Sequence, residues 1–145
     1  MPRPEIDIVA YKPAENVLKW VECKTYMHSP GVHMGHVTRG KDQIKVFGDK
    51  SYRKIVTEVL LTQMNSEGLL LAKPKVKYCL AAAHVKSDEI RDKMKAKFKK
   101  ENWELWEEEW IGSNVRKLAD EGYEDEIAVV VAQLWERTKP KELAP

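Results

Sequence analysis

The chain has 145 residues, of which 43% are hydrophobic and 33% charged, and its formal net charge is +2. A chain of this length usually forms one domain with a buried core, and this composition excludes a disordered or collagen-like protein. Apolar runs are far shorter than the ~18 residues of a membrane span, and the first residues do not resemble a signal peptide. The two cysteines, Cys23 and Cys79, cannot by themselves form a disulfide framework or a zinc site. We therefore expect a reduced, cytoplasmic protein.

The small net charge conceals a strong segregation of charge along the sequence. Residues 1–38 balance at zero, residues 39–100 carry sixteen basic and seven acidic side chains (+9), and residues 101–145 carry five basic and twelve acidic ones (−7). This distribution indicates either a basic surface for a polyanion or two solvated faces of opposite charge.

The first half of the chain contains a predicted hairpin. Residues 5–11 alternate in polarity and are rich in β-branched side chains, which predicts a strand, and residues 17–26 predict a second. The connection over 12–16 contains Pro and Asn and is too short for anything but an antiparallel pair. One more short strand is predicted at 43–47.

From residue 50 onward the apolar spacing alternates between helical and strand periods. The expected elements are an amphipathic helix over 50–67, a buried central strand over 76–83, a helix from Ser87 to Lys100, a short strand over 103–106, and helices over 108–120 and 124–137. Asp49 or Ser51 can cap the first helix, and Gly68 can end it. This order predicts a single α/β domain with a mixed sheet over residues 1–140, followed by a tail over 141–145.

Side-chain alternation on the second strand places Glu22 and Lys24 on one face. If Tyr11 pairs with Leu18, Asp7 falls directly across from Glu22, where Cβ atoms are about 4.5–5.5 Å apart. Two carboxylates this close repel each other unless a cation lies between them, and such oxygen ligands suit Mg²⁺ or Mn²⁺. Lys24 is placed to orient an attacking water or to neutralise charge that develops on a phosphate.

These residues resemble the signature of the PD-(D/E)XK nuclease superfamily: Asp7, then fourteen intervening residues, then Glu22-Cys23-Lys24. The longer run from Trp20 to Tyr26, followed by Ser-Pro-Gly-Val at 29–32, is similar to that of bacterial restriction-endonuclease-like proteins. The resemblance implies a restriction-endonuclease-like mixed β-sheet flanked by helices. It also implies that Asp7, Glu22 and the Cys23 carbonyl are metal ligands and that Lys24 is the catalytic lysine.

Two features depart from the family pattern. Ile6 stands where a proline often precedes the first acidic residue, and the helix that precedes the first strand in the family has no room before residue 5. That helix often supplies a further acidic ligand. Glu5, a partner chain in a homodimer, or a segment preceding Met1 can take its place, or else the module binds without cutting.

The resemblance implies a Mg²⁺-dependent nuclease that hydrolyses phosphodiester bonds, in DNA rather than RNA. Glu5, Tyr26, Gln63 and Glu58 are candidate auxiliary residues. Candidate contacts to the nucleic acid are the basic side chains that follow the motif: Arg39, Lys41, Lys45, Lys50, Arg53 and Lys54.

Two alternatives stay open. One is a non-catalytic nuclease-like module that binds nucleic acid or a protein. The other is a metal-independent RNA endonuclease, as in the distantly similar tRNA-splicing endonucleases, using a histidine with Lys24 and Tyr26. Its candidate histidines are His28, His33 and His36, for which exposed loop positions are the simpler interpretation, because their spacing matches no standard zinc site.

Overall fold

The computed structural model describes residues 6–26, 30–39, 44–120 and 131. Contacts between residues group the chain into two compact units, residues 1–107 and 108–145, which we describe separately, whereas the sequence predicts one domain over 1–140. In the described ranges, no helix is both long enough and apolar enough to cross a membrane.

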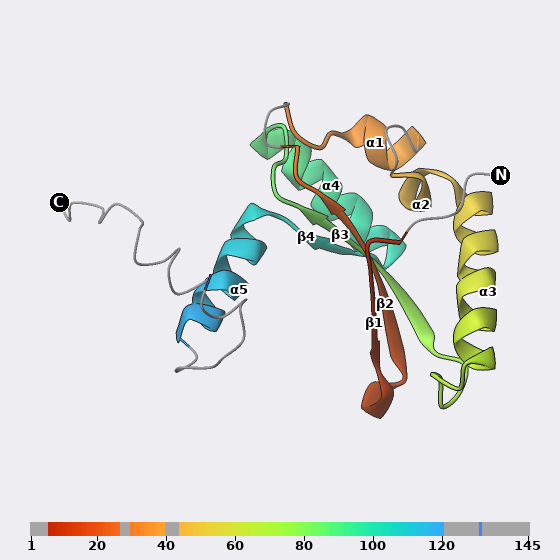
Figure 1. Cartoon of the computed structure of the whole chain (residues 1–145). Helices are drawn as coiled ribbons and strands as arrows, with labels where there is room; N and C mark the ends of the chain where they lie inside the picture. Colours follow the sequence, from red (N-terminus) through yellow and green to blue (C-terminus); the bar gives the residue numbers. More distant parts are fainter. Residues whose placement is uncertain (1–5, 27–29, 40–43, 121–130, 132–145) are drawn as a thin grey trace. The chain divides into compact units, whose positions relative to one another are not determined.

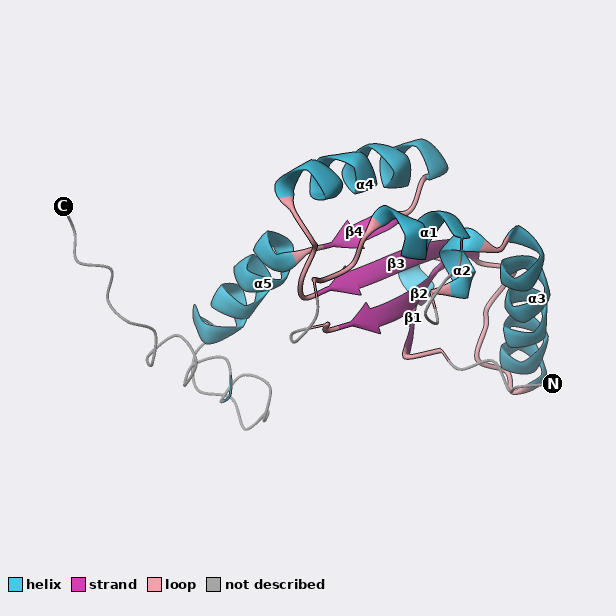
Figure 2. Ribbon diagram, turned by 90° about the horizontal axis from the view of Figure 1, so that it is seen from above, coloured by secondary structure: helices cyan, strands magenta, loops and turns pink. Residues whose placement is uncertain are grey.

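The first unit is a four-stranded mixed sheet with helices (Figures 1 and 2). Its elements in chain order are β1 (Ile8–Lys12), the 3-10 turn η1 (Pro13–Glu15), β2 (Val17–Lys24), α1 (Met34–Arg39), α2 (Lys45–Gly48), α3 (Lys50–Ser66), β3 (Lys75–Ala82), α4 (Asp88–Glu101) and β4 (Glu104–Trp106). The strand order is β1-β2-β3-β4. Because β1 is antiparallel to β2 while β3 and β4 continue the sheet in parallel, the predicted mixed α/β sheet is confirmed.

The β1–β2 hairpin has the register that was assumed in comparing Asp7 with Glu22. Tyr11 pairs with Leu18, and the turn closes at Asn16, whose φ of 49° is left-handed. Asn tolerates this conformation better than most residues, and its side chain accepts a hydrogen bond of 2.8 Å from the Tyr11 hydroxyl. The turn chemistry therefore sets which residues of β1 and β2 face each other.

Helices α3 and α4 are crossovers between parallel strands, and both begin at side-chain caps. Asp49 accepts the backbone N–H of Tyr52, and Ser87 accepts that of Ile90. The connection from β2 to β3 includes α1, α2 and α3, and Figure 1 shows the last turn of α3 next to the start of β3. Both predicted helices and the predicted central strand are confirmed.

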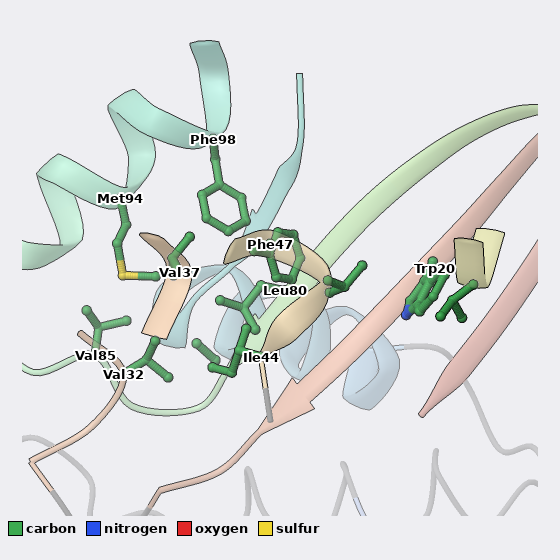
Figure 3. Close-up of a cluster of buried hydrophobic side chains, with 12 residues drawn as sticks. Trp20, Val32, Val37, Ile44, Phe47, Leu80, Val85, Met94 and Phe98 are labelled. Atoms are coloured by element: carbon green, nitrogen blue, oxygen red, sulfur yellow. The ribbon is translucent and has the colours of Figure 1, made fainter. Parts of the chain in front are cut away.

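The core lies on one face of the sheet, where side chains of β2 and β3 meet those of helices α1 to α4 (Figure 3). Trp20 and Leu80 project from the strands, and Met94 and Phe98 of α4 are buried, as their helical spacing predicts. The Phe47 and Phe98 ring centroids are 5.1 Å apart, a separation typical of stabilising aromatic pairs. This face is the one that also carries the candidate site.

The strand predicted at 43–47 is wrong. The segment forms α2, after the short helix α1, for which the sequence analysis predicted no element. Ile44, Val46 and Phe47 are all buried, and Phe47 packs between α4 and the Trp103 ring. Three apolar residues so close together fit a strand or one turn of helix equally well, and contacts with distant helices decided between them.

In the second unit, α5 spans Glu108–Asp120, which confirms the helix predicted there. The helix predicted over 124–137 lies outside the described residues apart from position 131.

Candidate active site

The candidate site lies at the carboxyl end of β2, on the core face of the sheet. In the parallel register with β3, Glu22 pairs with Leu80 and Lys24 with Ala82, and paired residues project to the same face. Leu80 and Ala82 belong to the core. Glu22 is accordingly buried, with 7% of its surface exposed, which is unusual for a carboxylate without a specific partner.

The partner of Glu22 is Lys24. The Lys24 Nζ lies 2.7 Å from Glu22 Oε1, and the two side chains are only 14% and 9% exposed. A buried charge of this kind is tolerated when it is paired and hydrogen-bonded, and removing one member leaves the other uncompensated. The pair is therefore an integrated part of the fold, unlike an exposed ion pair.

Asp7 completes the group from the neighbouring strand. The β1–β2 ladder ends at the pair Ile8 and Val21, and continuing this register by one residue places Asp7 opposite Glu22. Its Oδ2 accepts a 2.7 Å hydrogen bond from the backbone N–H of Cys23. A backbone donor thus holds one carboxylate while an ammonium holds the other.

The pKa values of the pair reflect this arrangement. Burial raises the pKa of Glu22; the Lys24 ammonium opposes that effect, and the negative charge of Asp7 adds to it. Burial acts to lower the pKa of Lys24, but the hydrogen bond to Glu22 and the charges of Glu22 and Asp7 outweigh it, so the pKa is raised. The structure therefore joins Asp7, Glu22 and Lys24 into one electrostatically coupled group.

Two tyrosines adjoin this group. Tyr52, in the first turn of α3, has its pKa raised by burial and by the charge of Glu22. Tyr52 was not among the site residues predicted from the sequence. The crossover rule would have identified it, because a helix that follows a parallel strand begins at that strand's carboxyl end. Tyr26, a predicted auxiliary residue, acts on Lys24 electrostatically and has a left-handed φ of 40°.

Two of the three histidines are brought beside Tyr26. The Tyr26 and His36 rings stack with centroids 5.4 Å apart, and His33 stacks on His36 at 3.7 Å. His36 is 5% exposed, so the expectation of exposed loop positions is wrong for it, while His28 lies outside the described residues. The Nδ1 atom of His36 accepts the His33 backbone N–H, and that of His33 accepts the Gly35 N–H. In the neutral rings the proton is therefore on Nε2.

Gly31 anchors the segment that carries these histidines. Val32 N–H donates to the His84 carbonyl and Lys86 N–H donates to the Val32 carbonyl, which forms a parallel bridge between Val32 and Val85. Gly31 has a φ of +90°, and a Cβ there would lie 2.7 Å from the His84 ring and 2.9 Å from its carbonyl oxygen. The close approach requires glycine.

Other residues predicted to belong to the site do not lie near Asp7, Glu22 and Lys24. Gln63 lies eleven positions after Tyr52 on α3, about 16 Å along the helix axis, and it donates to Glu67. Glu58 is exposed, and Glu5 lies outside the described residues. The helix runs toward the amino end of β3, away from the carboxyl end of β2, so a residue late in α3 does not adjoin Glu22.

The predicted nucleic-acid contacts divide into two kinds. Arg53 donates to the Val46 and Phe47 carbonyls, and its guanidinium stacks 5.0 Å from the Trp103 ring, which identifies it as a packing residue. Lys41 lies outside the described residues. The remaining four side chains are exposed on α1, α2 and the first turns of α3: Arg39, Lys45, Lys50 and Lys54.

The basic run on α4 is largely paired with acids. Arg91 and Lys95 both lie within ion-pair distance of Glu107, at 3.3 and 3.5 Å. Further along and around the helix, Lys97 pairs with Glu101, and Lys93 with Glu89. These partners favour a structural role for most of the run over contact with phosphates.

The side chains at the site can supply some of the ligands that a magnesium ion needs. Mg²⁺ commonly binds through one or two carboxylates and retains several waters. Asp7 and Glu22 supply two carboxylates, and no group of three or more His, Cys, Asp or Glu side chains suited to a metal occurs among the described residues. The third predicted ligand, Cys23, adjoins the pair through its backbone: its N–H binds Asp7. Two carboxylates on neighbouring strands fit a hydrated Mg²⁺ or Mn²⁺ but not a zinc site of nitrogen and sulfur ligands.

Comparison of the chain with protein-family models, with curated proteins and with solved structures finds no match in any of the three.

Proposed function

We propose that this chain is a metal-dependent nuclease of the PD-(D/E)XK type that hydrolyses phosphodiester bonds in DNA. One observation carries the proposal: Asp7, Glu22 and Lys24 from two adjacent strands form one coupled group at the carboxyl end of β2. A nuclease active site needs converging carboxylates and a cation beside the reacting phosphate. The four exposed basic side chains on α1, α2 and α3 are the surface proposed for the DNA backbone.

Asp7 and Glu22 would hold the divalent cation, with the Cys23 carbonyl as a further ligand. When bound, the cation supplies Lewis acidity and stabilises negative charge on the phosphate oxygens. Lys24 contributes a fixed positive charge beside the reacting phosphate, and in a site shielded from water such a charge acts more strongly than at the surface. Tyr52 and Tyr26 border the group, as their electrostatic effects with Glu22 and Lys24 indicate.

The test is cleavage of supercoiled plasmid and of labelled DNA and RNA oligonucleotides, with Mg²⁺ or with EDTA. Asp7→Asn and Glu22→Gln keep an acceptor oxygen while removing the charge, and each should slow Mg²⁺-dependent cleavage by about a hundredfold or more, as should Lys24→Met. Lys12→Met and Glu15→Gln at the exposed hairpin turn are the matched controls, since their ion pair lies away from the group.

The controls should cleave at the wild-type rate, and all variants should keep the wild-type circular dichroism spectrum. Cleavage that continues unchanged in EDTA, or in Asp7→Asn, refutes the metal mechanism. DNA binding without cleavage under any divalent cation would instead support the non-catalytic module.

A second candidate function is favoured by the stack of Tyr26, His36 and His33 beside Lys24. Histidine, tyrosine and lysine can carry out metal-independent RNA cleavage by proton transfer and charge neutralisation. This function requires RNA cleavage in EDTA that is lost in His33→Ala and retained in Asp7→Asn. Mg²⁺-dependent DNA cleavage with the reverse pattern excludes it.

A further inference from the structure

The carboxylate that the proposed function assigns to the divalent cation is already bound by a cation of the chain itself. Lys24 Nζ lies 2.7 Å from Glu22 Oε1, a normal distance for a charge-assisted hydrogen bond. This inference rests on the proposed function and concerns how the same site is regulated.

Burial strengthens the ion pair between Lys24 and Glu22. Glu22 and Lys24 are 9% and 14% exposed, so water can do little to solvate either charge if the pair separates. Asp7, in contrast, is held by the neutral backbone N–H of Cys23. Lys24 therefore supplies the positive charge that the two neighbouring carboxylates require in the absence of another cation.

We propose that Lys24 and the divalent cation compete for the Glu22 carboxylate, so that Lys24 closes the metal site until the cation displaces it. The lysine ammonium is a compact charge on a flexible four-carbon stem and can leave its partner without any movement of β2. Once displaced, it is available to a phosphate oxygen of the substrate. Lys24 thus binds Glu22 when no divalent cation is present and can bind the substrate phosphate when the cation is present.

Competition between Lys24 and the cation lowers the affinity of the site for the cation. If Lys24 must leave Glu22 before the cation binds, the cost of breaking the ion pair is subtracted from the affinity for the cation. Replacing Lys24 by the uncharged Met then removes this cost and should tighten divalent-cation binding by roughly tenfold. The same replacement should abolish cleavage, so affinity and activity change in opposite directions.

The chain offers a matched control on the same strand. Lys19 also forms an ion pair, at 2.8 Å, but with Glu104, on the other face of the sheet from Glu22. Lys19→Met, like Lys24→Met, removes one positive charge from β2, and it leaves the candidate site intact. It therefore reports the general effect of net charge on cation binding.

The experiment is isothermal titration of Mn²⁺ into the full chain without nucleic acid. We expect tighter binding for Lys24→Met, wild-type binding for Lys24→Arg and Lys19→Met, and no binding for Glu22→Gln. If Lys24→Met does not fold, Lys24→Gln replaces it, and the rise in Tm caused by Mn²⁺ provides a second measure of binding.

The outcomes separate the two proposals. Wild-type binding with no gain in Lys24→Met or Lys24→Gln, or an equal gain in Lys19→Met, overturns the competition and leaves the nuclease proposal standing. Failure of the wild type and of every variant to bind Mn²⁺ overturns the metal-dependent nuclease together with the competition.

Discussion

Gly31→Ala should destabilise the protein strongly, because both the backbone conformation and the space at this position demand glycine. The φ of +90° costs a residue with a Cβ about 1–2 kcal/mol. The added Cβ would also lie 2.9 Å from the His84 carbonyl oxygen and 3.0 Å from the Lys86 nitrogen, both backbone atoms that cannot rotate away.

The magnitude follows from what must move. Relief of the contacts separates Val32 from the segment at 84–86 and strains two hydrogen bonds, of 2.9 and 3.1 Å, each contributing about 1 kcal/mol. Together, the strained hydrogen bonds and the conformational cost should lower the free energy of unfolding by about 3 kcal/mol.

Gly68→Ala is the matched control. Gly68 has a φ of +70° and would place its Cβ in open space, with no atom within 4 Å. Gly68→Ala has the conformational cost of the positive φ but makes no close contacts, so we expect it to lower the free energy of unfolding by about 1 kcal/mol. The reduced entropy of the unfolded chain affects both substitutions alike and cancels in their difference.

The assay is equilibrium unfolding in urea, monitored by tryptophan fluorescence and circular dichroism. A difference of about 2 kcal/mol between the two variants is the result expected from the contacts at Gly31. Equal losses for Gly31→Ala and Gly68→Ala would refute the reasoning, since they would show that the segment at 30–33 does not depend on its bridge to the segment at 84–86.

Two further predictions concern residues whose role the tertiary structure defines. Arg53→Lys should lower the free energy of unfolding by about 2 kcal/mol in urea denaturation. The reason is that an ammonium cannot replace the stacking on Tyr78 and Trp103 or the two hydrogen bonds to backbone carbonyls. An unchanged stability would contradict the packing role of Arg53. Burial raises the pKa of Cys79 to about 12, so iodoacetamide at pH 8 should modify only Cys23 in the native protein and both cysteines in denaturant, as mass spectrometry would show; native labelling of Cys79 would contradict its burial.

Local patterns predicted the elements well where a single period or cap dominated. The helix over 50–67 is confirmed within one residue, because Asp49 caps it and its apolar spacing is helical. The strand predicted at 43–47 was wrong because the spacing of Ile44, Val46 and Phe47 fits both a strand and a helix, and burial of these residues against other helices favours the helix. Elements with ambiguous periodicity are decided by contacts that the local sequence does not contain.

The site shows the same division. A short turn and strict alternation are local properties, so the sequence predicted that Asp7 would stand across from Glu22 and that Glu22 and Lys24 would share a face. Sequence distance alone wrongly suggested that Gln63 would adjoin them, since it does not reveal that α3 runs away from the carboxyl end of β2.

The sequence alone determined that the first two strands form an antiparallel hairpin, because the connection between them is short, and the pairing of Tyr11 with Leu18 assumed from it is the one observed. Only the tertiary structure decided that the face with Glu22 and Lys24 is the core face, that Tyr52 adjoins Glu22, and that Arg53 packs inward. Register depends on residues near in sequence, whereas burial depends on helices contributed by residues far along the chain. Burial makes the Glu22–Lys24 pair part of the core instead of a surface contact, and the proposed competition with a divalent cation depends on this burial.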